Sequence, residues 1–191
     1  LSVSTNAVLR LLGIDPNAPE EAVSEEEIRN RSKELGMLIT EEYKDKKAPI
    51  LIALLKGSVP FLAELIKHID LDIEYDFMDV SSYEGTESSG DIRILKDLDR
   101  SIRNENVILV EDIIDTGRTL KTVTRLMWEK GASDVKITTL LDKPERRTVE
   151  IEADYVGFTI PNEFVIGYGL DFNQKYRSLP YVGVLKEECY K

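Results

Sequence analysis

Cysteine, histidine and tryptophan are almost missing from this chain, whose 191 residues include one of each. The single cysteine, Cys189, cannot form an intrachain disulfide, and its place two residues from the C-terminus argues against a catalytic nucleophile. The single histidine, His68, is far in sequence from every motif discussed below, so we interpret it as a partly exposed helix residue. We therefore expect a reducing, cytoplasmic setting.

The chain also has no excess of positive charge and no long apolar run. Lys and Arg number 25 against 36 Asp and Glu, a net charge of −11, which opposes a nucleic-acid-binding or anionic membrane-binding surface. The longest unbroken apolar run, residues 50–55, falls far short of the roughly 20 residues that span a bilayer. The first residues lack the cationic start and long apolar block of a secretory signal. We expect neither a membrane nor a nucleic acid as partner.

Strand-like and helix-like segments alternate along the chain. Ser24 followed by Glu27 has the form of a capping box, and apolar residues then recur at helical spacing to about Tyr43. Two further helices are expected after Pro60 and before Gly131. The alternation predicts one α/β domain with a mostly parallel sheet covered on both faces. The expected strands cover residues 50–55, 73–83, 92–95, 107–110, 135–143, 153–160 and 163–169.

The segment 107–119 (VILVEDIIDTGRT) carries the strongest chemical signal. Glu111 and Asp112 follow directly on a buried strand, and Asp115 precedes a Thr-Gly-Arg-Thr turn into a helix. Ligands of parallel sheets bind at the carboxyl ends of strands, where such a turn forms a nest for phosphate. Acids also cap helices, but three at one strand end are costly without partners. The segment predicts a ligand with a phosphate on one side and a ribose on the other.

This segment resembles the phosphoribosyl-diphosphate (PRPP) motif of the phosphoribosyltransferases. LLKGS (54–58) resembles their pyrophosphate loop and SSYEG (81–85) their flexible catalytic loop, while LLDKPERR (140–147) and EFVIGYGLDFNQKYR (163–177) resemble the purine-binding parts of the hypoxanthine-guanine members. The resemblance begins at about residue 24 and reaches the C-terminus. The order of the five motifs makes it specific.

The resemblance implies a type I phosphoribosyltransferase fold, which is a mostly parallel twisted sheet flanked by helices, with a small hood formed by the N- and C-terminal segments. Residues 1–20 are then an N-terminal extension to which we assign no role, and residues 21–191 form a single domain. Its core covers about 45–155, and its hood covers about 21–44 and 156–191.

The implied reaction is purine salvage, in which the 5-phosphoribosyl group of PRPP passes to hypoxanthine or guanine with Mg²⁺, giving IMP or GMP and pyrophosphate. The resemblance assigns the ribose hydroxyls to Glu111 and Asp112, directly or through a metal. It assigns the general base facing purine N7 to Asp115. The 5′-phosphate is assigned to Thr116, Gly117, Arg118 and Thr119, with Arg118 standing where many relatives have lysine.

Pyrophosphate contacts are implied at Lys56, Gly57 and Arg177, with a cis peptide bond between Leu55 and Lys56. Asp171 is the implied ligand of a Mg²⁺ on pyrophosphate, beside the metal candidates Glu111 and Asp112. Ser82 and Tyr83 of the flexible loop are expected to meet the pyrophosphate. Without the resemblance, a Lys-Gly-Ser sequence after a strand indicates only a turn.

Purine recognition is implied at the segments that contain Lys143 and Phe164. An ammonium only donates hydrogen bonds, so Lys143 favours purines that carry an oxygen at C6. Phe164 would stack on the purine, and the backbone of Val165 and Asp171 would meet its Watson–Crick edge. Without the resemblance, Lys143 reads as a surface residue and Phe164 as a core residue.

Two other functions compete with the enzyme. A PRPP- or nucleotide-sensing regulator on the same fold would bind RNA through a basic face, which the net charge opposes. A phospho-acceptor receiver domain accounts for the acids after residue 110 but leaves LLKGS, SSYEG and the Lys143 segment unexplained. The resemblance also implies a homodimer or homotetramer.

Overall fold

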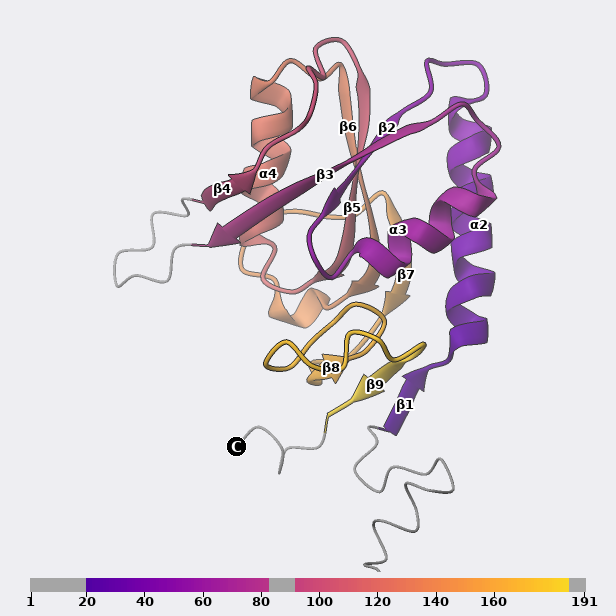
Figure 1. Cartoon of the computed structure of the whole chain (residues 1–191), viewed down its shortest axis with the longest axis vertical. Coiled ribbons are helices and arrows are strands. Elements are labelled where there is room, and N and C mark those ends of the chain that lie inside the picture. Colours follow the sequence, from indigo (N-terminus) through magenta and orange to yellow (C-terminus); the bar gives the residue numbers. More distant parts are fainter. Residues whose placement is uncertain (1–19, 83–91, 186–191) are drawn as a thin grey trace, which may run out of the picture.

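The structure, a computed structural model, describes residues 20–82 and 92–185, which form two sheets (Figure 1). The larger sheet has six strands in the order β4-β3-β2-β5-β6-β7. Neighbouring strands are parallel except for β3 and β4, so the predicted mostly parallel sheet is confirmed. The strands are β2 (Ile50–Leu54), β3 (Glu74–Ser82), β4 (Ile92–Lys96), β5 (Asn106–Ile114), β6 (Asp134–Asp142) and β7 (Tyr155–Thr159).

β2 shows why the longest apolar run of the sequence becomes a strand. It pairs in parallel with β3 on one side and β5 on the other, and all five of its residues are buried. Leu51 and Ala53 belong to one hydrophobic cluster, whereas Ile50 and Ile52 belong to the cluster on the opposite face. A strand covered on both faces needs apolar residues at every position.

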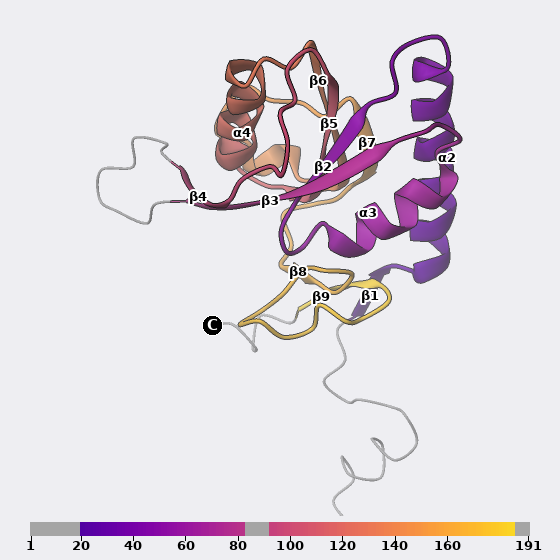
Figure 2. The same ribbon diagram turned by 45° about the horizontal axis from the view of Figure 1, so that its top comes forward.

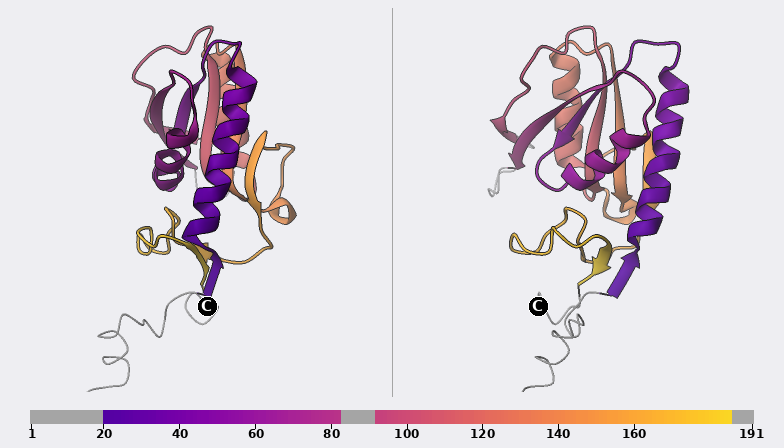
Figure 3. Two further views of the ribbon diagram at one scale, coloured as in Figure 1. Left: turned by 90° about the vertical axis from the view of Figure 1, so that its right-hand side faces the viewer. Right: turned by 45° about the vertical axis from the view of Figure 1, so that its right-hand side comes forward.

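Helices cover both faces of the large sheet (Figures 1 and 3). α2 (Glu25–Tyr43) and α3 (Val59–Leu65, continued by the 3₁₀ turn η1, Ile66–His68) pack on the face of Leu51, and α4 (Arg118–Glu129) packs on the other. α2 begins at the predicted capping box, where the Glu27 N–H donates to Ser24 Oγ at 3.2 Å and the Ser24 N–H donates to Glu27 Oε2 at 2.8 Å. Within the described ranges, none of the helices has the length and hydrophobicity to cross a bilayer.

A three-stranded antiparallel sheet lies beyond the carboxyl ends of the parallel strands (Figure 2). Its order is β1-β9-β8, from β1 (Glu20–Val23), β9 (Val182–Val184) and β8 (Val165–Ile166), so it joins the two ends of the described chain. The strand expected over 163–169 contributes only two residues, because Gly167 and Gly169 have left-handed φ angles of 90° and 99°.

The small sheet takes less of the chain than the hood expected from the sequence. Of residues 21–44, only β1 lies in it, whereas α2 packs on the large sheet through Ile28, Leu35 and Ile39. β7, at the start of the expected second hood segment, is the edge strand of the large sheet. An amphipathic helix needs an apolar partner, and the large sheet supplies it. Nearly all of the expected N-terminal extension lies outside the described residues.

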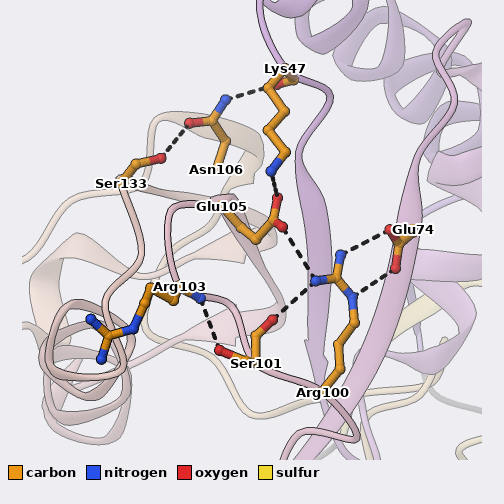
Figure 4. A network of polar contacts seen from close by, with 8 residues as sticks. All are labelled: Lys47, Glu74, Arg100, Ser101, Arg103, Glu105, Asn106 and Ser133. Atoms are coloured by element: carbon orange, nitrogen blue, oxygen red, sulfur yellow. Dashed lines mark hydrogen bonds and ion pairs between the residues drawn. The ribbon is translucent and has the colours of Figure 1, made fainter.

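Ion pairs hold the opposite, amino-terminal end of the large sheet together (Figure 4). Arg100 Nε and Nη2 each contact a different carboxylate oxygen of Glu74, at 2.9 and 2.8 Å. Arg100 Nη1 also lies 3.3 Å from Glu105, which pairs with Lys47 Nζ at 2.5 Å. The segments that lead into β2, β3 and β5 are thereby joined at the end of the sheet away from the acidic motif.

Candidate active site

The acidic motif lies at the carboxyl end of β5, beside the end of β6. Pairing between these two strands continues to Ile114. Glu111 and Asp112 therefore lie inside the strand, not directly after it as the sequence predicted. The turn of residues 115–117 then leads into α4.

Gly117 shapes this turn. It is the N-cap of α4 and has a left-handed φ of 78°, which favours glycine. A side chain would also collide, because an ideal Cβ would lie 2.5 Å from Ile151 Cγ2. The turn and the first turn of α4 border a cavity of about 120 Å³ at the helix N-terminus, where backbone N–H groups favour an anion. Its lining includes Asp115, Thr116, Gly117, Arg118 and Thr119.

Glu111 and Asp112 form an acidic pair with little compensating charge. Burial raises the pKa of Glu111 well above its usual value, and the charge of Asp112 adds to this effect. Burial also raises the pKa of Asp112 to about 6, although the Ile113 N–H and the Arg177 guanidinium act in the opposite direction. In the described part of the chain, Glu111 forms no ion pair. The pair suits a ligand that brings hydroxyl donors or positive charge.

A second cavity, of about 240 Å³, joins the loop after β2 to the acidic pair. The Leu55–Lys56 peptide bond is cis, as the resemblance implied. The Gly57 backbone lies directly against the carboxylate of Asp112. Residues far apart in sequence therefore share this cavity, and its lining includes Lys56, Gly57, Glu111, Asp112 and Arg177.

Arg177 is oriented by its own loop. Its Nη2 lies 2.7 Å from Asp171 Oδ1, and its Nη1 donates to the Gly169 carbonyl at 2.6 Å. The other Asp171 oxygen accepts from the Gln174 N–H at 2.8 Å. Asp171 lies near enough to Asp112 for its charge to raise the pKa of that residue. The Asp171 carboxylate is thus fixed beside the cavity that contains Asp112.

Protein side chains alone do not build a metal centre here. Among the described residues, no group of three or more His, Cys, Asp or Glu side chains is arranged to hold an ion. Mg²⁺ uses one or two carboxylates and completes its shell with phosphate oxygens and water. The acidic pair of Glu111 and Asp112, with Asp171 nearby, fits such an ion arriving with a phosphorylated ligand.

Lys143 directly follows β6 and is buried, with 7 % of its surface exposed. Its ammonium donates to the backbone carbonyl of Glu163. Burial lowers the pKa of Lys143, while the nearby charge of Asp115 acts in the opposite direction. Interpreted from the residues alone, Lys143 was a surface residue, and the structure shows that this interpretation is wrong.

Phe164 and Val165 directly follow the carbonyl that Lys143 contacts. Phe164 is 38 % exposed, and its ring meets the edge of Phe172 at a centroid distance of 5.7 Å. Val165 is buried in β8, where it pairs with Val184 of β9. The structure therefore places the end of β6 beside the start of β8, with a buried ammonium next to a partly exposed aromatic residue.

Sequence reasoning left Arg146 and Arg147 without a role. Arg146 Nε lies 3.0 Å from Asp115 Oδ1, and Arg147 Nη1 donates to the Asp115 carbonyl at 2.9 Å. Arg147 also pairs with the carboxylate of Asp142. Their position just after Lys143 was the only available signal, since nothing in the spacing pointed to Asp115.

Most of the predicted flexible loop lies outside the residues that the structure describes. Tyr83 lies outside the described residues. Ser82 is the last residue of β3, and its side chain is outside the description as well. The assignments of these two residues remain predictions.

The fold, with an acidic strand end followed by a glycine turn into α4, is that of a phosphoribosyltransferase, as comparison with known proteins shows. A family model described as "Phosphoribosyl transferase domain" matches residues 25–173. The hypoxanthine-guanine phosphoribosyltransferase of Lactococcus lactis is 60 % identical over 169 residues, which cover 88 % of this chain and 91 % of that protein. The Streptococcus mutans protein of the same name is 56 % identical over 178 residues, covering 93 % and 98 %.

Solved structures give the same result. A Staphylococcus aureus hypoxanthine phosphoribosyltransferase superimposes with a TM-score of 0.87 at 47 % identity, covering 98 % of this chain and 100 % of that one. The Trypanosoma cruzi hypoxanthine phosphoribosyl transferase has a TM-score of 0.88 at 40 % identity, covering 92 % and 95 %. The chain belongs to the hypoxanthine-guanine phosphoribosyltransferase family, whose members are glycosyltransferases. These relatives give no support to the regulator.

Proposed function

We propose that this protein transfers the 5-phosphoribosyl group of PRPP to hypoxanthine or guanine, releasing pyrophosphate and forming IMP or GMP. The observation that carries the proposal is the meeting of three features at one end of the large sheet. These are the turn of residues 115–119 around Gly117, which we call the phosphate turn, the cavity between Lys56 and Arg177, and the buried ammonium of Lys143. Relatives at about 60 % identity carry this activity in their names.

The phosphate turn receives the 5′-phosphate of PRPP. Backbone N–H groups of residues 116–119 at the start of α4 bind its oxygens, and Arg118 adds positive charge. Glu111 and Asp112 lie in β5, a few residues before this turn. They accept hydrogen bonds from the ribose 2′- and 3′-hydroxyls, directly or through a metal. Hydroxyl donors relieve the uncompensated charge of this acidic pair.

The cavity beside Gly57 receives the pyrophosphate. Lys56 and Arg177 neutralise part of its charge, and Arg177 is already oriented by Asp171. Glu111, Asp112 and Asp171 are the residues that would hold Mg²⁺, on one or both sides of the substrate. When bound, Mg²⁺ neutralises charge on the leaving pyrophosphate.

The purine lies between Lys143 and Phe164. The Lys143 ammonium donates to the oxygen at C6. This hydrogen bond replaces the one that the ammonium makes to the Glu163 carbonyl in the structure. The exposed ring of Phe164 stacks on the base, and the backbone of Val165 and Asp171 meets its Watson–Crick edge. As N9 bonds to the ribose C1 and pyrophosphate departs, the proton on N7 passes to Asp115. Lys143 and Asp115 thus act on the same edge of the purine, at the oxygen on C6 and at N7.

A homodimer or homotetramer in the cytoplasm completes the proposal. Large apolar side chains are exposed on α2 and α4, with Met37 at 60 %, Leu38 at 53 % and Trp128 at 47 %. Contact between copies would remove this surface from water. Sedimentation velocity at micromolar concentration tests the assembly, and a single species of monomer mass would contradict it.

Steady-state pyrophosphate release tests the reaction. The protein is supplied with PRPP, Mg²⁺ and one of hypoxanthine, guanine, xanthine, adenine or uracil. We expect rapid release with hypoxanthine or guanine and formation of the matching nucleotide. A protein that binds PRPP but releases pyrophosphate with none of the bases would be a sensor, and the proposal would be wrong.

A further inference from the structure

The segment after β6, residues 143–148, makes a series of hydrogen bonds to the backbone of the phosphate turn and of the residue before it. The Lys143 N–H donates to the Ile114 carbonyl at 3.0 Å, and the Thr148 N–H donates to the Thr116 carbonyl at 3.1 Å. Between these two bonds, Arg147 binds the Asp115 carbonyl. The backbone on both sides of Asp115 is therefore fixed by residues 143–148.

The side chain of Asp115 has a separate restraint. Its Oδ1 lies 3.0 Å from Arg146 Nε, and within the described residues this is its only hydrogen bond. The pair is half-exposed, with 43 % of the Asp115 side chain and 49 % of the Arg146 side chain accessible. Arg146 uses one carboxylate oxygen and leaves Oδ2 for another donor.

The origin of Arg146 links this restraint to base recognition. Arg146 ends the 3₁₀ turn η2 (Pro144–Arg146), and its N–H donates to the Lys143 carbonyl at 3.1 Å. One short turn therefore carries both the ammonium that meets C6 and the guanidinium that meets Asp115. C6 and N7 are close on the purine ring, so the groups that bind at these positions must keep a fixed relative geometry.

We propose that Arg146 is a positioning residue that holds the Asp115 carboxylate with Oδ2 directed to purine N7. The proposal rests on the general-base role given to Asp115 above. An aspartate on a turn otherwise samples several rotamers, and a displacement of about 1 Å can cost on the order of 100-fold in rate. Arg147 has a different part, because it is mostly buried and fixes the backbone rather than the carboxylate.

Four variants test this: R146Q, R146K, D115N and the double variant R146Q/D115N. The matched control is R125Q, which removes an exposed arginine that pairs with Glu129 at 3.5 Å on α4. Single-turnover rates with hypoxanthine are measured at saturating PRPP and Mg²⁺, together with the KM for PRPP and the melting temperature. An exposed ion pair contributes little to folding, so Tm should stay within about 3 °C in R146Q and R125Q.

We expect R146Q to lower the single-turnover rate about tenfold with the KM for PRPP unchanged within about twofold, and R146K to restore part of the rate. In the D115N background, R146Q should have no further effect. Equal losses in both backgrounds would show that Arg146 acts independently of Asp115, and a wild-type rate in R146Q would show that it does not act at all. A wild-type rate in D115N would instead remove the general base, and the role of Arg146 with it.

Discussion

The Asp112 carboxylate lies directly against the Cα of Gly57, so close that an ideal Cβ at position 57 would be 1.5 Å from Asp112 Oδ2. Gly57 is confined on its other side as well, because an ideal Cβ at Gly169 would be 1.9 Å from the Gly57 carbonyl oxygen. The resemblance implied a pyrophosphate contact at Gly57. The structure adds that the glycine also leaves space for the Asp112 side chain of β5, the strand beside β2 in the sheet.

G57A should therefore weaken PRPP binding. The new methyl group must displace the Asp112 carboxylate, since real Cβ atoms essentially never approach within 3.0 Å. We expect the Kd for PRPP with Mg²⁺, measured by calorimetry, to rise at least about tenfold, the equivalent of about 1.4 kcal/mol. G131A is the matched control, because its Cβ would meet no atom closer than 3.4 Å and its φ of 89° costs stability away from the site. Binding by G57A within threefold of wild type would contradict the contact.

D115N should keep PRPP binding and lose turnover. Asn has almost the same shape as Asp but cannot accept the N7 proton, and a positioned base typically contributes about 10²–10⁴-fold. The measurement is the single-turnover rate at saturating hypoxanthine, beside the Kd for PRPP. A rate within threefold of wild type would disprove the base assignment.

Lys143 should set the preference for purines with an oxygen at C6. Its ammonium is buried and can only donate, so an amino group at C6 would face it donor to donor and be left unpaired, at a cost of about 1–3 kcal/mol or more. K143Q should narrow the hypoxanthine-to-adenine ratio of kcat/KM by about tenfold or more, mainly by losing activity with hypoxanthine.

Two further variants complete that measurement. K143M should lose the favourable contact without gaining an acceptor, and K33Q on the exposed face of α2 is the matched control. An unchanged ratio in both K143Q and K143M would move base selection to the backbone around Val165.

Glu105 should make part of the stability depend on pH. The hydrogen bond from Lys47 holds the pKa of Glu105 below its usual value, and Arg100 contributes in the same direction against burial. A lowered pKa gives a contribution that is fully present above the unfolded-state value, about 4.3, and is lost as the pH falls through the folded-state value.

E105Q should remove this contribution. The free energy of unfolding, measured in urea at pH 7 and at pH 3, should fall more in wild type than in E105Q, by no more than about 1 kcal/mol. The matched control is E129Q at the exposed pair with Arg125, which should fall like wild type. Equal falls in wild type and E105Q would show that the network of Figure 4 contributes nothing measurable.

The parts of this structure that the sequence predicted are those set by local patterns. The unbroken apolar run at residues 50–55 and the capping box at Ser24 each specify one element, and both elements form where expected. Strands β1 and β9 were missed because they are only four and three residues long and pair with segments far away in sequence.

Contacts between motifs that are far apart in the sequence could not be predicted from local sequence patterns. Nothing along the chain indicates that Gly57 touches Asp112 or that Arg146 touches Asp115, because these contacts depend on which strands become neighbours. Glu111 was placed after the strand because its charge suggests an end, yet pairing with β6 carries the strand past it. The polarity of a side chain alone does not show where the backbone pairing of a buried strand ends.

The small sheet makes one half of the site depend on pairing between the two ends of the described chain. β2 to β7 supply the phosphate turn, and they follow one another along the chain. The wall that contains Phe164 and Val165 depends on β8, which pairs with β9, and β9 in turn pairs with β1 from the other end. Because contacts between segments so far apart in sequence carry a high loop-closure entropy, we expect the pairing of β1 with β9 to form late in folding. A chain truncated before residue 180 would therefore keep the segment around Gly117 but lack the strand with which both β1 and β8 pair.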